Sequence, residues 1–98
     1  MPKPKLTRSS GNVFRDLGFP ADEAEHLRIR SLLMIEVRKL IEARGLTQKQ
    51  AAALFGVTQP RVSDLVRGKI DLFSIDTLVD MLSSAGARVD IVVEGVPA

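Results

Sequence analysis

The sequence predicts a small, mainly α-helical protein: a bundle of four to five helices followed by one C-terminal β-strand. Three observations indicate this fold. Apolar residues recur at helical spacing in four successive segments, and a glycine follows each segment. Residues 88–94 then change to a β-branched pattern that begins by alternating apolar and polar side chains, which is typical of a strand. The chain has 98 residues, of which 45% are hydrophobic, so it can build one core and has little room for a second.

Three parts are expected along the chain. Residues 1–20 contain two early prolines and a Ser-Ser-Gly-Asn run, which predict a flexible N-terminal arm. Residues 21–86 hold all four helical segments and are expected to form the folded domain. Residues 87–98 are expected to form the C-terminal strand and a tail, with a role in dimerisation.

The first and last helical segments each carry one apolar stripe. The first is long: we expect it to start near Asp22, whose carboxylate can cap it, and to end at Gly45 in a left-handed conformation. Its stripe consists of Leu33, Val37, Leu40 and Ile41. The last segment runs from about Ser74 to Ala85, and Gly86 ends it. Its stripe consists of Ile75, Leu78, Val79 and Leu82.

Two short helices are expected between these segments. Thr47 and Gln50 have the spacing of a capping box, in which the side chain of each residue accepts a hydrogen bond from the backbone amide of the other. Thr58 is expected to cap the next helix, whose first turn accommodates Pro60 without loss of a helical hydrogen bond. The apolar residues of this helix are expected to face inward; they are Val62, Leu65 and Val66.

Small residues at fixed spacing indicate that these two helices form a helix-turn-helix. Ala52 lets the two helix backbones approach, and Gly56 permits a turn conformation that other residues resist. The segments 45–52 and 55–59, together with Arg67-Gly68-Lys69, resemble the XRE family of phage-repressor-like (Cro-like) helix-turn-helix proteins. The resemblance covers residues 33–85. It implies a transcriptional regulator that binds double-stranded DNA and needs no cofactor.

The two ends of the chain extend this resemblance. Residues 10–18, which read Ser-Gly-Asn-Val-Phe-Arg-Asp-Leu-Gly, and the closing strand are similar to those of the antitoxin-type (HigA-like) branch of the family. The similarity implies an antitoxin of a type II toxin–antitoxin operon that binds a RelE-like or HigB-like toxin and represses its own promoter. The alternative is a protein-interaction module that neutralises a partner protein without specific DNA binding.

The outward face of the second short helix supplies the candidate base contacts. In helix-turn-helix proteins the N-terminal end of this recognition helix enters the major groove. Gln59 lies there, and a glutamine amide can pair with adenine N6 and N7; the family resemblance also implies a base-reading glutamine at this position. Arg61 and Ser63 are the other candidates. Asp64 is not counted as a contact, since it repels phosphate; it can accept from cytosine N4 or pair with Arg61 or Arg67.

Positive charge gathers around the same two helices. Residues 44–69 carry five basic side chains against one acid, whereas residues 70–98 carry five acids against one arginine. A basic face is the electrostatic footprint of a polyanionic partner. Phosphate contacts are expected from the helix N-termini and from basic side chains, namely Gln48, Lys49, Thr58, Arg67 and Lys69.

The predicted strand needs a partner, because a lone strand leaves backbone donors and acceptors unpaired. We favour the same strand of a second copy, related by a two-fold axis, with Val89, Ile91 and Val93 on the buried face. Such a homodimer would read a palindromic operator at half-sites about one helical turn apart. The alternatives are pairing within the chain to residues 12–16 and addition to the sheet of a toxin.

The composition argues against enzymatic and membrane functions. Cysteine is absent, and His26 is the only histidine. Asp76 and Asp80 lie one helical turn apart without further ligands, so no metal site is expected. No apolar run approaches the roughly 20 residues that span a bilayer, and no secretory signal is recognisable. We therefore expect a cytoplasmic protein that is not an enzyme.

Overall fold

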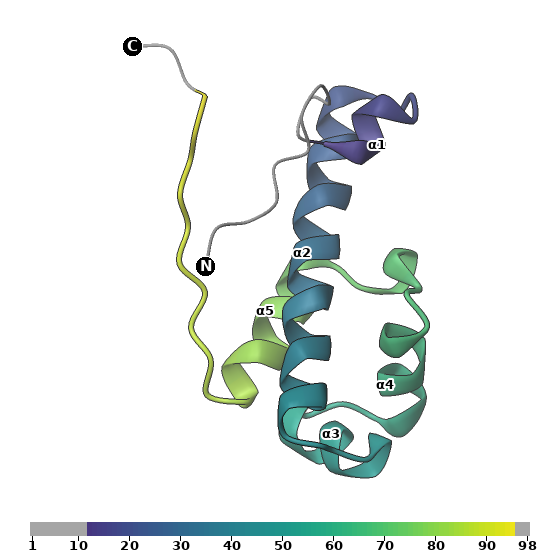
Figure 1. Ribbon diagram of the computed structural model, residues 1–98, viewed down its shortest axis with the longest axis vertical. Coiled ribbons are helices and arrows are strands. Elements are labelled where there is room, and N and C mark those ends of the chain that lie inside the picture. Colours follow the sequence, from purple (N-terminus) through teal and green to yellow (C-terminus); the bar gives the residue numbers. More distant parts are fainter. Residues whose placement is uncertain (1–11, 96–98) are drawn as a thin grey trace.

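The computed structural model describes residues 12–95, which form helices connected by short turns (Figure 1). In chain order the elements are α1 (Val13–Asp16), α2 (Ala21–Ala43), α3 (Gln48–Phe55), α4 (Gln59–Val66), the 3-10 helix η1 (Ile70–Leu72) and α5 (Ile75–Ser84). Helix α2 is the spine of the molecule. Helices α3 and α4 lie towards its C-terminal end, α5 packs against it, and α1 folds back on its N-terminal turns (Figure 1). The predicted helical bundle is confirmed.

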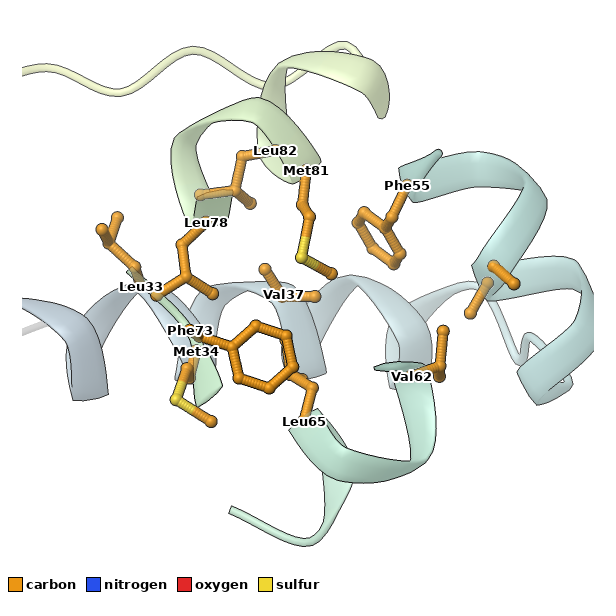
Figure 2. Close-up of a cluster of buried hydrophobic side chains, with 12 residues drawn as sticks. Leu33, Met34, Val37, Phe55, Val62, Leu65, Phe73, Leu78, Met81 and Leu82 are labelled. Atoms are coloured by element: carbon orange, nitrogen blue, oxygen red, sulfur yellow. The ribbon is translucent and has the colours of Figure 1, made fainter. Parts of the chain in front are cut away.

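The core lies where α2, α3, α4 and α5 meet. Figure 2 shows side chains from all four helices converging around Val37 of α2. Phe73, which connects η1 to α5, is 1% exposed and fills the same space (Figure 2). The buried cluster consists of Leu33, Met34, Val37, Ala51, Ala52, Phe55, Val62, Leu65, Phe73, Leu78, Met81 and Leu82. One aliphatic core with two phenylalanines therefore holds the helix-turn-helix against α2.

Local sequence signals set the ends of the short helices. The Thr47 hydroxyl accepts a hydrogen bond from the Gln50 amide (3.1 Å), and the Gln50 side chain accepts one from the Thr47 amide (2.9 Å), so the predicted capping box is confirmed. Gly56 ends α3 at φ +69°, a left-handed conformation that residues with a Cβ rarely adopt. The turn between α3 and α4 thus follows directly from the local sequence.

Two predicted caps are wrong. Helix α2 begins at Ala21, after Pro20, and no side chain caps it. Asp22 lies inside the first turn, where its carboxylate still interacts favourably with the helix dipole. The Thr58 side chain makes no capping hydrogen bond to α4, and Pro60 at the second helical position lacks one of the amides that a capping hydroxyl would bond.

The segment predicted to be a flexible arm, residues 1–20, includes a packed helix in its described part. Asn12 is 5% exposed; its side-chain oxygen accepts hydrogen bonds from the amides of Phe14 (3.0 Å) and Arg15 (3.3 Å). Its side-chain nitrogen donates to the Ala24 carbonyl (3.0 Å), which ties α1 to α2. The rings of Phe14 and Phe19 meet edge to face, with centroids 6.1 Å apart. Residues 1–11 lie outside the described residues.

The predicted C-terminal strand is not formed within residues 12–95. Residues 87–95 leave α5 as extended chain without the hydrogen-bonded ladder of a strand (Figure 1). Val89 packs against the core, whereas Ile91 and Val93 are 82% and 77% exposed. The alternative of pairing with residues 12–16 is wrong, because residues 13–16 are helical. A strand needs a neighbouring strand for its hydrogen bonds, and the described part of this single chain offers none.

Val62 and Val66 provide a matched test of how α4 is oriented. Val62 is 1% exposed, whereas Val66, predicted to face inward, is 38% exposed at the edge of the packed face. We predict that Val62→Ala lowers the free energy of unfolding by about 2 kcal/mol, because two buried methyl groups are lost from a filled core. Val66→Ala should cost less than about 1 kcal/mol. Urea denaturation measures both; equal losses would contradict this orientation.

Candidate nucleic-acid interface

Helix α4 has one buried and one exposed face. Val62 and Leu65 are 1% and 0% exposed and lie in the core (Figure 2). Gln59 is exposed in the first turn, and Ser63, four residues on, is half-buried on the same side. Because the two core residues hold the rotation of α4 about its axis, Gln59 and Ser63 face away from the core. The structure thus brings together two of the three residues predicted to contact bases.

Four of the five residues predicted to contact phosphate are exposed at the ends of α3 and α4. Gln48 and Lys49 occupy the first turn of α3, and Thr58 and Arg67 flank α4. The Thr47 hydroxyl takes the Gln50 amide, so the two amides before it have no acceptor in their own helix. The first turn of α3 therefore offers amide donors and a cationic side chain side by side, which suits a phosphate.

Arg61, the third predicted base contact, has partners within the molecule. Its Nη1 donates a hydrogen bond to the Leu72 carbonyl (2.8 Å), and its guanidinium carbon lies 4.4 Å from the centre of the Phe73 ring. Two residues along a helix correspond to about 200° of rotation, so Arg61 lies on a different side of α4 from Ser63. These contacts join α4 to the connection between η1 and α5.

Lys69, the fifth predicted phosphate contact, forms an ion pair with Asp64. Its Nζ lies 3.4 Å from the Asp64 carboxylate, and the two side chains are 48% and 25% exposed. The prediction that Asp64 pairs with Arg61 or Arg67 is therefore wrong. Gly68, at φ +75°, turns the chain back after α4 and brings Lys69 over the helix. The pair offsets the one acidic charge beside the recognition face.

Arg30 is a residue near this site that the sequence analysis did not identify. It belongs to α2, and its Nη1 donates to the Ile70 carbonyl (3.3 Å), 40 positions away in the chain. Together with Arg61 it holds two carbonyls of the segment between α4 and α5. No local pattern could have indicated this contact, because the partner is a backbone atom of a distant turn.

The exposed groups of this face are an amide, a hydroxyl and several cations, which suit hydrogen bonds to bases and ion pairs with phosphates. Across residues 12–95, no three side chains of the types His, Cys, Asp and Glu are grouped closely enough to hold a metal ion. None of the helices described has the length and apolar character that spanning a membrane requires.

Comparisons with known proteins agree with this geometry. Residues 13–94 match a family model described as a helix-turn-helix domain. The chain is 40% identical over 89 residues to the "Putative antitoxin HigA2" of Mycobacterium tuberculosis, a match that covers 90% of this chain and 88% of that protein. A solved structure described as a "Putative XRE Family Transcriptional Regulator" matches this chain with a TM-score of 0.70 and 32% sequence identity. The match covers 76% of this chain and 84% of the chain in that structure.

The fold and the exposed face of α4 define a DNA-binding regulator of the helix-turn-helix class. The chain belongs to the helix-turn-helix domain family, and within it to the XRE-type regulators that resemble HigA antitoxins. The resemblance predicted from residues 33–85 and 10–18 is confirmed. This family is typically non-enzymatic, in agreement with the prediction from composition.

The contacts of Arg61, near the start of α4, predict a stabilising role that Arg67, at the other end of the helix, lacks. Arg61→Ala should lower the free energy of unfolding by about 1–2 kcal/mol, because it removes a charged hydrogen bond to a carbonyl and a cation–π contact. Arg67→Ala, which removes the same charge from an exposed position, should cost no more than about 0.5 kcal/mol. Thermal denaturation at matched ionic strength compares the two. Equal stabilities would show that the contacts of Arg61 contribute nothing.

Proposed function

We propose that this protein is a sequence-specific transcriptional repressor that binds the operator of its own gene and acts in the cytoplasm as the antitoxin of a type II toxin–antitoxin operon. The observation that carries the DNA-binding part is the pair of exposed Gln59 and half-buried Ser63, which face away from the core because Val62 and Leu65 are buried on the other side of α4. An amide and a hydroxyl at the N-terminal half of a recognition helix are suited to read base edges in the major groove.

Phosphate contacts would fix the position of α4 in the groove. We assign them to Gln48 and Lys49 at the start of α3, and to Thr58, Arg67 and Lys69 around α4; their exposure and charge support this assignment. Arg61 would have to break its hydrogen bond to the Leu72 carbonyl before it could bond a guanine base. We therefore assign the main base contacts to Gln59 and Ser63.

The antitoxin part of the proposal rests on similarity. The relative described as an antitoxin matches 90% of this chain, so the likeness extends well beyond the helix-turn-helix itself. We therefore propose a RelE-like or HigB-like toxin as the protein partner.

Residues 88–94 support a homodimer. They are extended and β-branched, and their apolar side chains Ile91, Val92 and Val93 are 82%, 80% and 77% exposed. Burying three such side chains against a second copy is favourable, and antiparallel pairing would satisfy the backbone of both strands. We propose that Val89, Ile91 and Val93 form the buried face of this two-fold contact, and that the dimer reads a palindromic operator.

Gln59→Ala tests base readout. We predict that it weakens binding to DNA from upstream of the gene by about 1–3 kcal/mol, because an unpaired adenine edge replaces a bidentate contact. Binding to scrambled DNA of equal length should not change. Fluorescence anisotropy titrations measure both. An equal loss on both DNAs would mean that Gln59 contacts the backbone and reads no base.

Lys49→Ala tests phosphate contact on the same DNAs. We predict weaker binding to specific and scrambled DNA alike, and a slope of log K against log salt that is smaller by about 1, since one fewer counterion is released. The control is Lys39→Ala, which removes a cation paired with Glu36 on the side of α2 that faces residues 87–90. An unchanged slope for Lys49→Ala would argue against its contact with phosphate.

Neighbouring apolar residues test the strand-mediated dimer. Ile91→Asp should convert the dimer to a monomer, because it places a charge in the buried contact. Val92→Asp should preserve the dimer, since alternate residues of a strand point to opposite faces. Sedimentation velocity gives the mass of each. A wild-type monomer, or dissociation by both substitutions alike, would contradict the proposed face.

A further inference from the structure

Asp64 is the one acidic side chain in residues 44–69, a stretch that carries five cations. It belongs to α4, the helix proposed to enter the major groove. An uncompensated carboxylate between the two phosphate backbones would weaken binding to DNA of every sequence. The surroundings of Asp64 show how this charge is compensated and what the carboxylate can still bond.

The rotation of α4 turns Asp64 outward as far as Ser63. Val62 and Leu65 are 1% and 0% exposed, so the line midway between them marks the inward direction of the helix (Figure 2). At about 100° per residue, Ser63 and Asp64 each lie about 50° from the opposite, outward direction, one on either side. Asp64 therefore belongs to the same outward face as Ser63.

Lys69 holds the Asp64 carboxylate and offsets its charge. The amide of Lys69 donates to the Asp64 carbonyl (3.0 Å), and its Nζ lies 3.4 Å from Asp64 Oδ1. The Asp64 side chain is 25% exposed, so it remains accessible beside the lysine. A carboxylate has two oxygens with about four lone-pair sites, so one lysine leaves it able to accept a further hydrogen bond.

The major-groove edges of the bases determine which of them a carboxylate can bond. Cytosine presents only a donor, its N4 amino group, whereas guanine presents two acceptors and thymine presents an acceptor and a methyl group. Adenine presents a donor, but its N7 acceptor lies beside that donor and repels a carboxylate oxygen. A carboxylate therefore favours cytosine and opposes the other three bases, and such opposition is a source of specificity.

We propose that Asp64 reads a cytosine of the operator and that Lys69 is its neutralising partner. The carboxylate accepts a hydrogen bond from cytosine N4. Lys69 keeps the net charge of the pair at zero and, with three N–H donors, can bond Asp64 and a phosphate together. The inference rests on the proposed repressor function and adds to the base contacts of Gln59 and Ser63. Repulsion of phosphate, the reason for not counting Asp64 as a contact, is removed by the ion pair.

The test measures base preference at every position of the operator. The full chain is titrated by fluorescence anisotropy with DNA from upstream of its gene, and with duplexes in which each base pair in turn is replaced by the other three. For the wild type we expect one position in each half-site at which replacing a C·G pair weakens binding about tenfold or more.

Asp64→Asn should change the preference at that position alone. The penalty for replacing C·G should fall to within about twofold, or the preference should move to A·T, because an asparagine amide pairs with adenine N6 and N7. Asp64→Ala, which removes the acceptor, should lose the same preference. The control is Asp80→Asn, which removes the same charge from an exposed position of α5 and should leave every preference unchanged. Thermal denaturation verifies that each variant folds.

Lys69→Gln tests the neutralising partner. It should weaken binding to all the duplexes, and about fivefold more in the wild-type background than together with Asp64→Asn, because only the wild type then exposes an unpaired carboxylate to the phosphates. An equal loss in both backgrounds would show that Lys69 does not offset the charge of Asp64, and would overturn the paired readout.

The remaining outcomes separate the inference from the function on which it rests. If the wild type does not distinguish upstream from scrambled DNA, the repressor function fails and the inference fails with it. If it does distinguish them, and Asp64→Asn changes the affinity for all duplexes by the same factor, Asp64 acts only through its charge. The cytosine contact is then overturned and the repressor function stands.

Discussion

The burial of Val62 and Leu65 is the constraint on which the recognition face depends. A helix of eight residues has little stability of its own and takes its orientation from what it packs against. Here the two side chains enter a core built around Val37 and Phe73 (Figure 2). Since side chains four residues apart share a face, the same rotation that buries the pair turns Gln59 and Ser63 outward. The same two buried residues, Val62 and Leu65, therefore both fill the core and direct Gln59 and Ser63 outward.

Polar contacts at the rim of the core hold the chain that follows α4. Arg61 bonds the Leu72 carbonyl, Arg30 bonds the Ile70 carbonyl, and Lys69 pairs with Asp64. Each contact is partly exposed and individually worth about 1 kcal/mol or less. Together they fix the position of the short turn between α4 and α5, whose Ile70 and Leu72 carbonyls would otherwise be hydrogen-bonded by water. Phe73 enters the core from this turn, so the rim contacts and the core support each other.

Features set by neighbouring residues could be predicted from the sequence. The capping box at Thr47 and Gln50, the left-handed turn at Gly56 and the buried stripe of α2 each depend on residues within one or two helical turns. The contact of Arg30 with Ile70 spans 40 positions, and its acceptor is a carbonyl that every residue has, so no pattern marks it. The Thr58 cap failed, and Pro60, two positions on, has no backbone amide for the hydroxyl to bond, a loss that the capping propensity of threonine alone does not include.

The C-terminal segment shows a different limit of sequence reasoning. Its alternating β-branched residues favour an extended backbone. A strand also needs a second segment to pair with, and the described part of the chain contains only this one extended segment. Helix α1 was not predicted either: Asn12 caps it locally, but a single helical turn also needs its contacts with α2, among them the hydrogen bond from Asn12 to the Ala24 carbonyl 12 positions away. Apart from Ala87 and Val89, which pack against the core, both segments lie outside it, and both expose apolar side chains. The core packs without most of these two segments, so their exposed apolar side chains are available for contacts with other proteins: one segment is β-branched and extended, and the other is a single helical turn in which the charges of Arg15 and Asp16 cancel.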